Sequence, residues 1–155
     1  MTALPEHSPL GASGAYRWMP CPGSVGMAKQ IPRPESSEYA LEGTCAHTVA
    51  AACLEDTSHG REPWQMIGWH DKETGFTVTS EMSLAVCDFV FAIRDQHPNL
   101  DANNVEHSFH CPGIHPDFHG TADFWGIVGR TLHVWDYKHG QGIAVAVKHN
   151  PQTMY

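Results

Sequence analysis

The sequence predicts an α/β protein in which helices come first and strands follow them. Two segments, 37–55 and 80–96, repeat apolar residues at steps of three and four, the period of a helix with one buried face. After Pro98 apolar β-branched and aromatic residues alternate with polar ones, which is typical of strands. With 155 residues the chain can bury a core without disulfides. We therefore expect a single domain over 1–155.

The first part of the chain combines an irregular stretch with a long helix. Residues 1–35 are rich in Pro, Gly and Ser, which predicts loops with short helical turns at 14–19 and 23–29. Either of the two serines at 36 and 37 can cap the helix that follows, and Glu38 suits its first turn. The expected inward stripe of this helix is Ala40, Gly43, Thr44, His47, Ala50, Ala51 and Leu54.

The second helix and the strands have equally local signals. Thr79 or Ser80 can cap a helix that ends at about Gln96, before Pro98. Its expected core stripe is Met82, Val86, Phe89, Val90 and Ile93. Strands are predicted at 105–111, 121–128, 132–138 and 143–147. The dipeptide Gly129-Arg130 suits a two-residue turn, so the second and third strands should form a hairpin.

Charge and cysteine content exclude some classes of protein. Nine Lys and Arg against 17 Asp and Glu give a net charge of −8, which argues against a protein that coats nucleic acid by charge alone. The five cysteines include no CxxC pair and are expected to be free thiols rather than ligands of an iron–sulfur cluster. No secretion signal or long apolar run occurs, so we expect an intracellular protein without a membrane partner.

The chemistry of the chain is concentrated in the predicted hairpin. A turn at Gly129-Arg130 places Asp123 opposite Asp136, and like charges in that position are unfavourable unless a cation lies between them. Mg²⁺ or Mn²⁺ is the expected cation, because both prefer oxygen ligands. Lys138 should emerge on the same face as Asp136 and can stabilise charge on a phosphate. Solvated structural carboxylates are the alternative.

Three residues upstream could complete such a site. His47 on the first helix could be a third ligand from a different element, although a histidine on an inward stripe can also be an ordinary core residue. Glu42 lies well around the helix from His47 and fits a solvated side chain better. Glu106, on the strand before the hairpin, is an intermediate candidate.

These motifs, taken in order, resemble a known superfamily. The sequence contains His47 on a helix, Gly-Thr-Ala-Asp at 120–123, Asp-Tyr-Lys at 136–138 and Gln-Thr-Met-Tyr at 152–155. This order is similar to the PD-(D/E)XK nucleases, and within them to the RecB-type exonuclease branch. The opening Trp18, Cys-Pro-Gly-Ser at 21–24 and the segment 37–47 also look like phage-encoded members of unknown function, so the resemblance spans nearly the whole chain.

The resemblance implies a restriction-endonuclease-like core, a mixed β-sheet flanked by helices. It makes His47, Asp123 and Asp136 metal ligands, the main-chain carbonyl of Tyr137 a further one, and Lys138 the catalytic lysine. Gln152 and Tyr155 would lie near DNA or support the site. The last motif reads QxxY rather than QxxxY, and the helix expected from Asn150-Pro151 stops short at Tyr155, which weakens these two assignments.

The function expected from this resemblance is that of a metal-dependent deoxyribonuclease. It would be a phage or prophage exonuclease in a bacterial cytoplasm, acting in recombination, replication or repair. The mechanism would be hydrolysis of a phosphodiester by a metal-activated water. Single- or double-stranded DNA ends are the expected substrate, and a homo-oligomer or a phage recombination protein is open as a partner. The alternative is a non-catalytic protein on the same scaffold that binds or regulates a DNA-processing complex.

A third alternative rests on a separate group of residues. Between 107 and 119 the chain carries one cysteine and several histidines, a combination that can bind zinc. These residues are His107, His110, Cys111, His115 and His119. Because their spacing is loose and parity sends His110 to the other strand face, they fit a zinc site only if the intervening loop folds back. Scattered surface histidines are the simpler interpretation.

Overall fold

The computed structural model describes residues 8–32, 35–140 and 149–152, and it divides into two compact units. The larger unit consists of Ser36–His107 and Ala122–Gln141, and contains the two long helices and the β-hairpin. The other unit consists of Met1–Glu35, Ser108–Thr121 and Gly142–Tyr155. The candidate residues His47, Glu106, Asp123, Asp136 and Lys138 lie in the larger unit.

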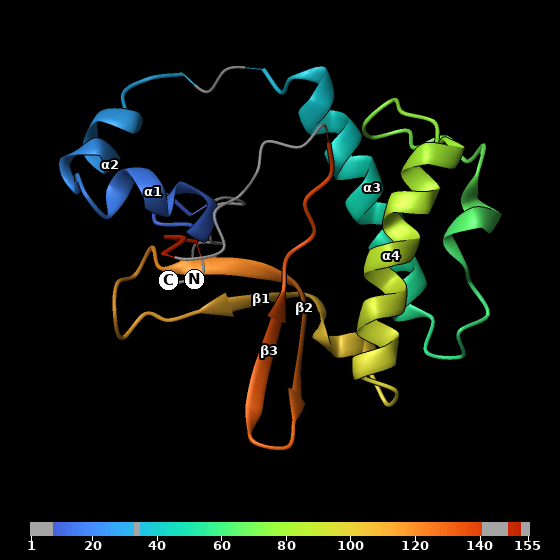
Figure 1. The fold of residues 1–155 in the computed structure, drawn as a ribbon. Helices are drawn as coiled ribbons and strands as arrows, with labels where there is room; N and C mark the ends of the chain where they lie inside the picture. Colours follow the sequence, from blue (N-terminus) through green and yellow to red (C-terminus); the bar gives the residue numbers. More distant parts are fainter. Residues whose placement is uncertain (1–7, 33–34, 141–148, 153–155) are drawn as a thin grey trace. The chain divides into compact units, whose positions relative to one another are not determined.

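The described residues form four α-helices and a three-stranded antiparallel sheet (Figure 1). The helices are α1 (Ala15–Trp18), α2 (Gly23–Ala28), α3 (Glu38–Glu55) and α4 (Ser80–Gln96), and the strands are β1 (Val105–His110), β2 (His119–Val128) and β3 (Thr131–Trp135), in the order β1-β2-β3. The α/β class is thus confirmed. The sheet is antiparallel in the described part of the chain where a mixed sheet was expected, and the strand predicted at 143–147 lies outside the described residues.

Helix α3 begins as predicted, and Ala50 and Leu54 are buried as predicted, but the rest of its buried face differs from the predicted stripe. The Ser37 side chain caps it by accepting a hydrogen bond from the Ala40 amide. Its buried residues are Cys45, Ala46, Val49, Ala50, Cys53 and Leu54. The predicted stripe was wrong at Ala40 and Thr44, which are exposed. The helix carries small residues on all its faces, so the contrast in hydrophobicity between the faces is weak. The two cysteines pack as small apolar side chains and lie on the buried face.

Helix α4 matches its prediction. The Thr79 hydroxyl accepts a hydrogen bond from the Met82 amide, and the helix ends at Gln96. The predicted core residues Met82, Val86, Val90 and Ile93 are all buried, and Phe89 packs against the same core. Helices α3 and α4 run side by side (Figure 1) and bury these faces against each other. This packing fixes α3, which carries His47.

The hairpin has the predicted register but a shorter third strand. Phe124 pairs with Trp135, and Gly129 begins the two-residue turn with a φ of 61°, which favours glycine. The prediction that β3 reaches Lys138 was wrong, because β3 ends at Trp135. The cause is local: the Tyr137 amide donates its hydrogen bond to the Asp123 side chain instead of a main-chain carbonyl.

The smaller unit confirms the predicted helical turns. Helices α1 and α2 lie within the stretches 14–19 and 23–29, and the Trp18 indole donates a hydrogen bond of 3.0 Å to the Gly11 carbonyl. Lys29 Nζ lies 3.4 Å from Asp117 Oδ2, which ties α2 to the loop before β2. Across both units, none of the helices of the described residues is long and apolar enough to span a membrane.

Gly126 is required by close packing in the larger unit. A Cβ at this position would lie 2.6 Å from both Cε1 and Nδ1 of His97, whose side chain is buried behind the hairpin. Because the imidazole must shift to admit a methyl group, we expect Gly126→Ala to lower the free energy of unfolding by about 1–3 kcal/mol. Chemical denaturation followed by circular dichroism measures this loss.

Gly43 in α3 is the matched control for the same substitution. A Cβ there meets no atom within 4 Å, and the position is inside a helix. Gly43→Ala should therefore raise the free energy of unfolding by about 0.5–1 kcal/mol. Equal effects of the two substitutions would show that the contact with His97 does not limit position 126.

Candidate metal site

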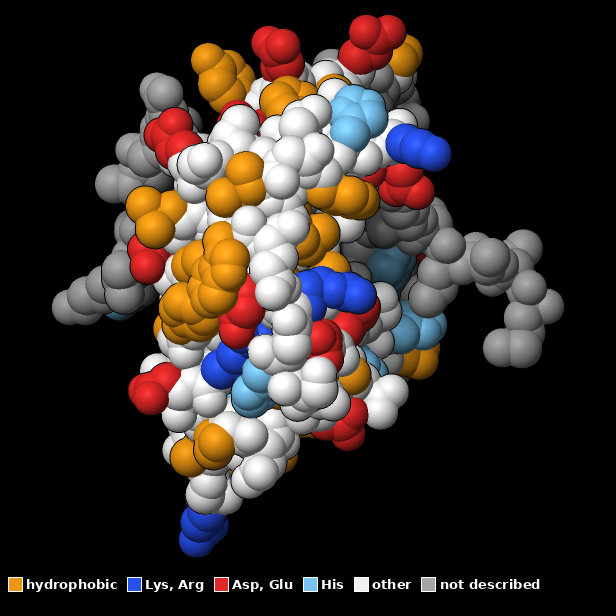
Figure 2. Space-filling view, turned by 90° about the vertical axis from the view of Figure 1, so that its right-hand side faces the viewer, with side chains coloured by type: hydrophobic (Ala, Val, Ile, Leu, Met, Phe, Trp, Pro, Cys, Tyr) orange, Lys and Arg blue, Asp and Glu red, His pale blue; other side chains and the backbone are white. Residues whose placement is uncertain are grey.

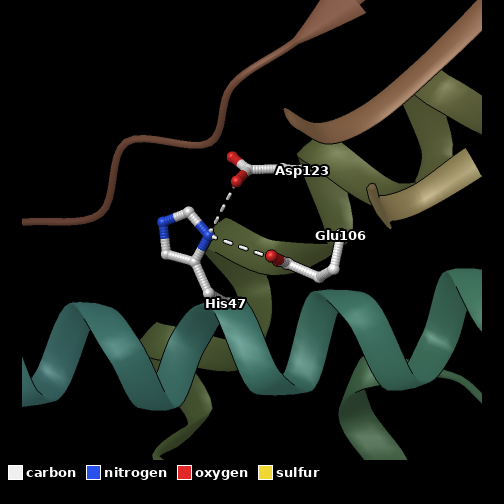
Figure 3. Close-up of side chains that lie close together, drawn as sticks. All are labelled: His47, Glu106 and Asp123. Carbon is white, nitrogen blue, oxygen red and sulfur yellow. Dashed lines mark ion pairs between the residues drawn. The ribbon is translucent and has the colours of Figure 1, made fainter. Parts of the chain in front are cut away.

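Three side chains from three elements converge beside α3 (Figure 3). His47 comes from α3, Glu106 from β1 and Asp123 from β2, and one ligand atom of each lies within 4.8 Å of the others. His47 Nδ1 lies 3.4 Å from Asp123 Oδ1 and 3.9 Å from Glu106 Oε1. The side chains of His47, Glu106 and Asp123 are 32 %, 41 % and 15 % exposed, so the cluster is anchored in the fold yet open to solvent.

The backbone positions two of these side chains, and at Glu106 it does so in a strained conformation. Asp123 is fixed from behind, because one of its carboxylate oxygens accepts the Tyr137 amide while the other faces His47. Glu106 has a backbone φ of 45°, a value that residues with a Cβ rarely adopt. Such a conformation costs about 1–3 kcal/mol and is typically kept at functional sites. The strain at Glu106 thus supports a functional role for this cluster.

The electrostatics of the cluster favour added positive charge. Burial alone would lower the pKa of His47, but the hydrogen bond and charge of Asp123 and the charge of Glu106 raise it above the usual value. Burial raises the pKa of Glu106, and the Asp123 carboxylate raises it further. Carboxylate charge contributes to both shifts, because a negative charge nearby favours a bound proton. A divalent cation would satisfy the same demand.

The donor set fits Mg²⁺ or Mn²⁺. Two carboxylates supply the oxygen ligands that both ions prefer, and the exposed side of the cluster leaves room for water or a phosphate oxygen. The imidazole nitrogen of His47 suits a transition metal better than Mg²⁺. Within the described residues, this is the one group of three or more His, Cys, Asp or Glu side chains close enough to hold an ion.

Asp136 and Lys138 lie just beyond β3 and pair with each other. Lys138 Nζ is 2.6 Å from Asp136 Oδ2, and both side chains are about half exposed. The two residues thus share a face as predicted. Lys138 is also near enough to His47 for its charge to lower the imidazole pKa, against the larger effects that raise it. Asp136 is not one of the three converging side chains, so its role as a ligand stays a prediction.

Tyr137 and His139 point toward the interior, on the other side from this ion pair. The ring of Tyr137 is 5.4 Å from that of His47, and burial, with the charge of Asp88, raises the pKa of its hydroxyl to about 12. His139 Nε2 lies 3.7 Å from Glu42 Oε1. His139 was missed from the sequence, although its two-residue step from Tyr137 predicts a shared face. Metal binding by the Tyr137 carbonyl stays a prediction.

The remaining candidates are less informative. Gln152 lies in the smaller unit, where its amide donates to the Asn150 side chain as in a helix N-cap, and Tyr155 lies outside the described residues. Around the loop before β2, His110 Nε2 hydrogen-bonds to the Pro116 carbonyl and His115 Nδ1 accepts the Asp117 amide. The zinc interpretation finds no support in this arrangement. Among the described residues, this region does not assemble three metal ligands.

The fold and the cluster define a small α/β protein with a candidate site for one divalent cation. The chain belongs to a family described as "Protein of unknown function (DUF2800)", whose model matches residues 7–155. The match covers nearly the whole chain, so both compact units are part of the family's domain. No solved structure matches the chain.

Proposed function

We propose that this protein is a metal-dependent deoxyribonuclease whose cation is held by His47, Glu106 and Asp123. The convergence of these three side chains from α3, β1 and β2 carries the proposal. Lys138 supports it, because its ammonium, paired with Asp136, lies near enough to the cluster to act on the charge of His47. A cation beside a metal site can stabilise the negative charge that develops on a phosphate during hydrolysis. Mn²⁺ should serve better than Mg²⁺, since one ligand is an imidazole.

Each group has a defined task in this proposal. When bound, Mn²⁺ or Mg²⁺ supplies Lewis acidity toward a phosphate oxygen and lowers the pKa of a water molecule. Asp123 and Glu106 bind the cation with their carboxylates, and Asp123 is held in place by the Tyr137 amide. Lys138, paired with Asp136 in the structure, would place its ammonium on the phosphate, where negative charge develops during attack.

The proposal extends to the superfamily and the cellular role of the protein. We infer a PD-(D/E)XK core of the RecB type from the order of its motifs: a helical histidine, Asp123 on β2, and Asp136-Tyr137-Lys138 after β3. The same resemblance supports a phage or prophage exonuclease in a bacterial cytoplasm, acting on DNA ends in recombination, replication or repair. A homo-oligomer or a phage recombination protein is the partner that this role favours.

End-labelled linear DNA tests the activity. Single- and double-stranded substrates are incubated with the protein and Mn²⁺, Mg²⁺ or EDTA. We expect cleavage with Mn²⁺, slower cleavage with Mg²⁺, and none with EDTA. Loss of label from the ends first identifies an exonuclease. A folded protein that leaves both substrates intact with either metal would overturn the proposed activity.

Lys138→Met separates catalysis from cation binding. Methionine keeps most of the side-chain length but removes the charge, so cleavage should fall about 100-fold while Mn²⁺ affinity stays within about threefold. Lys72→Met, at an exposed residue of the same unit, is the matched control and should cleave as the wild type does. Equal cleavage by both variants would remove Lys138 from the mechanism.

A non-catalytic binding protein is the second candidate, and one observation favours it. Large hydrophobic side chains are exposed on the larger unit, and Figure 2 shows hydrophobic side chains on the surface among acidic and basic ones. Trp64 and Phe91, whose rings lie 6.0 Å apart, are two of them. Exposed apolar groups of this kind are common at protein interfaces. The binding role becomes the better account if the cleavage assay fails.

A further inference from the structure

Tyr137 touches two of the three candidate ligands at once. Its main-chain amide donates a hydrogen bond to Asp123 Oδ2, and its ring meets the His47 ring edge-on at 5.4 Å and 71°. The residue is 6 % exposed, and Phe89 of α4 packs on it at 5.0 Å. A movement of Tyr137 would therefore move the carboxylate and the imidazole together.

The hydroxyl of Tyr137 is linked to α3 through His139 and Glu42. It lies 3.0 Å from His139 Nδ1, and His139 Nε2 lies 3.7 Å from Glu42 Oε1. If the tyrosine hydroxyl donates to Nδ1, the imidazole carries its proton on Nε2, facing the Glu42 carboxylate. One tautomer thus serves both the hydrogen bond with Tyr137 and the electrostatic contact with Glu42, which at 3.7 Å is longer than a hydrogen bond. The His139 side chain is 10 % exposed, so little water competes for them.

These contacts connect two residues of the same helix. Glu42 and His47 both belong to α3, and the path from one to the other runs through His139 and Tyr137. Groups that orient metal ligands from behind set the affinity of a site, and their loss commonly weakens metal binding 10- to 100-fold. Glu42, expected from its helical position to be a solvated side chain, instead has a defined partner.

We propose that Tyr137 is the positioning residue of the cation site and that Glu42 and His139 hold it in place. The inference rests on the proposed cation site but not on the cleavage of DNA. It assigns the three residues a task in ligand geometry, with no contact to the substrate. Glu42, His139 and Tyr137 should therefore act as one unit on metal affinity.

Titration with Mn²⁺, followed by electron paramagnetic resonance of the free ion, tests this unit. Tyr137→Phe keeps the ring against His47 but loses the hydroxyl, and Glu42→Gln removes the distant charge. Each should weaken Mn²⁺ binding about 10-fold. In the double variant, Mn²⁺ affinity should also fall about 10-fold rather than 100-fold. Either substitution alone already breaks the series of contacts from Glu42 through His139 to Tyr137. Glu38→Gln, the same change at an exposed residue of α3, should bind as the wild type does.

The outcomes are distinguishable from failure of the proposed function. Wild-type affinity in Glu42→Gln, or losses that multiply in the double variant, would overturn the inference while the cation site stands. A wild-type protein that binds no Mn²⁺ would overturn the proposed function as well. Thermal denaturation of each metal-free variant accompanies the titration, because a purely structural role would lower stability and leave the affinity of the folded protein unchanged.

Discussion

Asp123→Asn should lower metal-dependent DNA cleavage at least about 100-fold without unfolding the protein. Asparagine has the shape of aspartate, and its amide oxygen can still accept the hydrogen bond of the Tyr137 amide. The substitution removes the charge that faces His47 at 3.4 Å and the oxygen ligand best shielded from water. Losing this carboxylate weakens the hold on the cation that stabilises the reacting phosphate, and removing such electrostatic stabilisation typically lowers the rate by factors of this size. Initial cleavage rates on end-labelled DNA measure the effect.

Asp95→Asn is the control for this substitution. Asp95 is an exposed carboxylate on α4, so the variant has the same net charge as Asp123→Asn but an intact cluster. Its cleavage rate should equal that of the wild type. If Asp123→Asn also cleaves at the wild-type rate, the reaction does not use this cluster, and the proposed site is refuted even where nuclease activity is found.

Arg94→Met should cause a large loss of stability. Arg94 Nη1 donates to Glu62 Oε2 at 2.9 Å, and Nη2 donates to the carbonyls of Cys53 and Arg61 at 2.8 and 3.0 Å. Its side chain is only 9 % exposed. Removing one partner of a buried ion pair leaves the other charge uncompensated and costs about 3–5 kcal/mol. In a chain of this length the melting temperature should fall by roughly 10 °C.

Two variants control the Arg94 experiment. Arg130→Met changes an exposed residue of the hairpin turn and should alter stability by less than about 0.5 kcal/mol. Glu62→Leu combined with Arg94→Met removes both charges, and part of the lost stability should return because no buried charge stays unpaired. An Arg94→Met protein that melts within about 2 °C of the wild type would show that this network does not hold α4 to the end of α3.

The hairpin shows how far local sequence signals extend. Gly129-Arg130 specifies a tight turn, and the turn alone fixes every pair from Val128 with Thr131 to Phe124 with Trp135. The end of β3 was not predictable from that rule, because it depends on a side chain. Asp123 takes the amide of Tyr137, and the main-chain ladder stops there.

The early end of β3 also determines which residues form the candidate site. Asp136 would face Asp123 only if the ladder continued one more pair, but the strand ends first and Asp136 pairs with Lys138. Glu106 joins His47 and Asp123 in the structure, and its position depends on the pairing of β1 with β2 and on a positive φ. Neither condition leaves a signal in a sequence. His47 and Asp123 were predictable because each carries its own local motif.

The buried face of α3 was predicted only in part, for a different reason. Ala, Gly, Thr and Cys have similar sizes and modest hydrophobicity, so no stripe stands out by periodicity. Tertiary packing against α4 decides the rotation of the helix. The result places His47 at the margin of the buried face, with its side chain about one-third exposed and facing Asp123, rather than in the core.

The most direct test of the account is an anomalous diffraction map of a crystal of the wild-type protein soaked in Mn²⁺. We expect one strong anomalous peak bounded by His47, Glu106 and Asp123, at a Mn²⁺ concentration that supports DNA cleavage. A map without a peak between these three side chains at that concentration, or with the ion bound elsewhere, would contradict it.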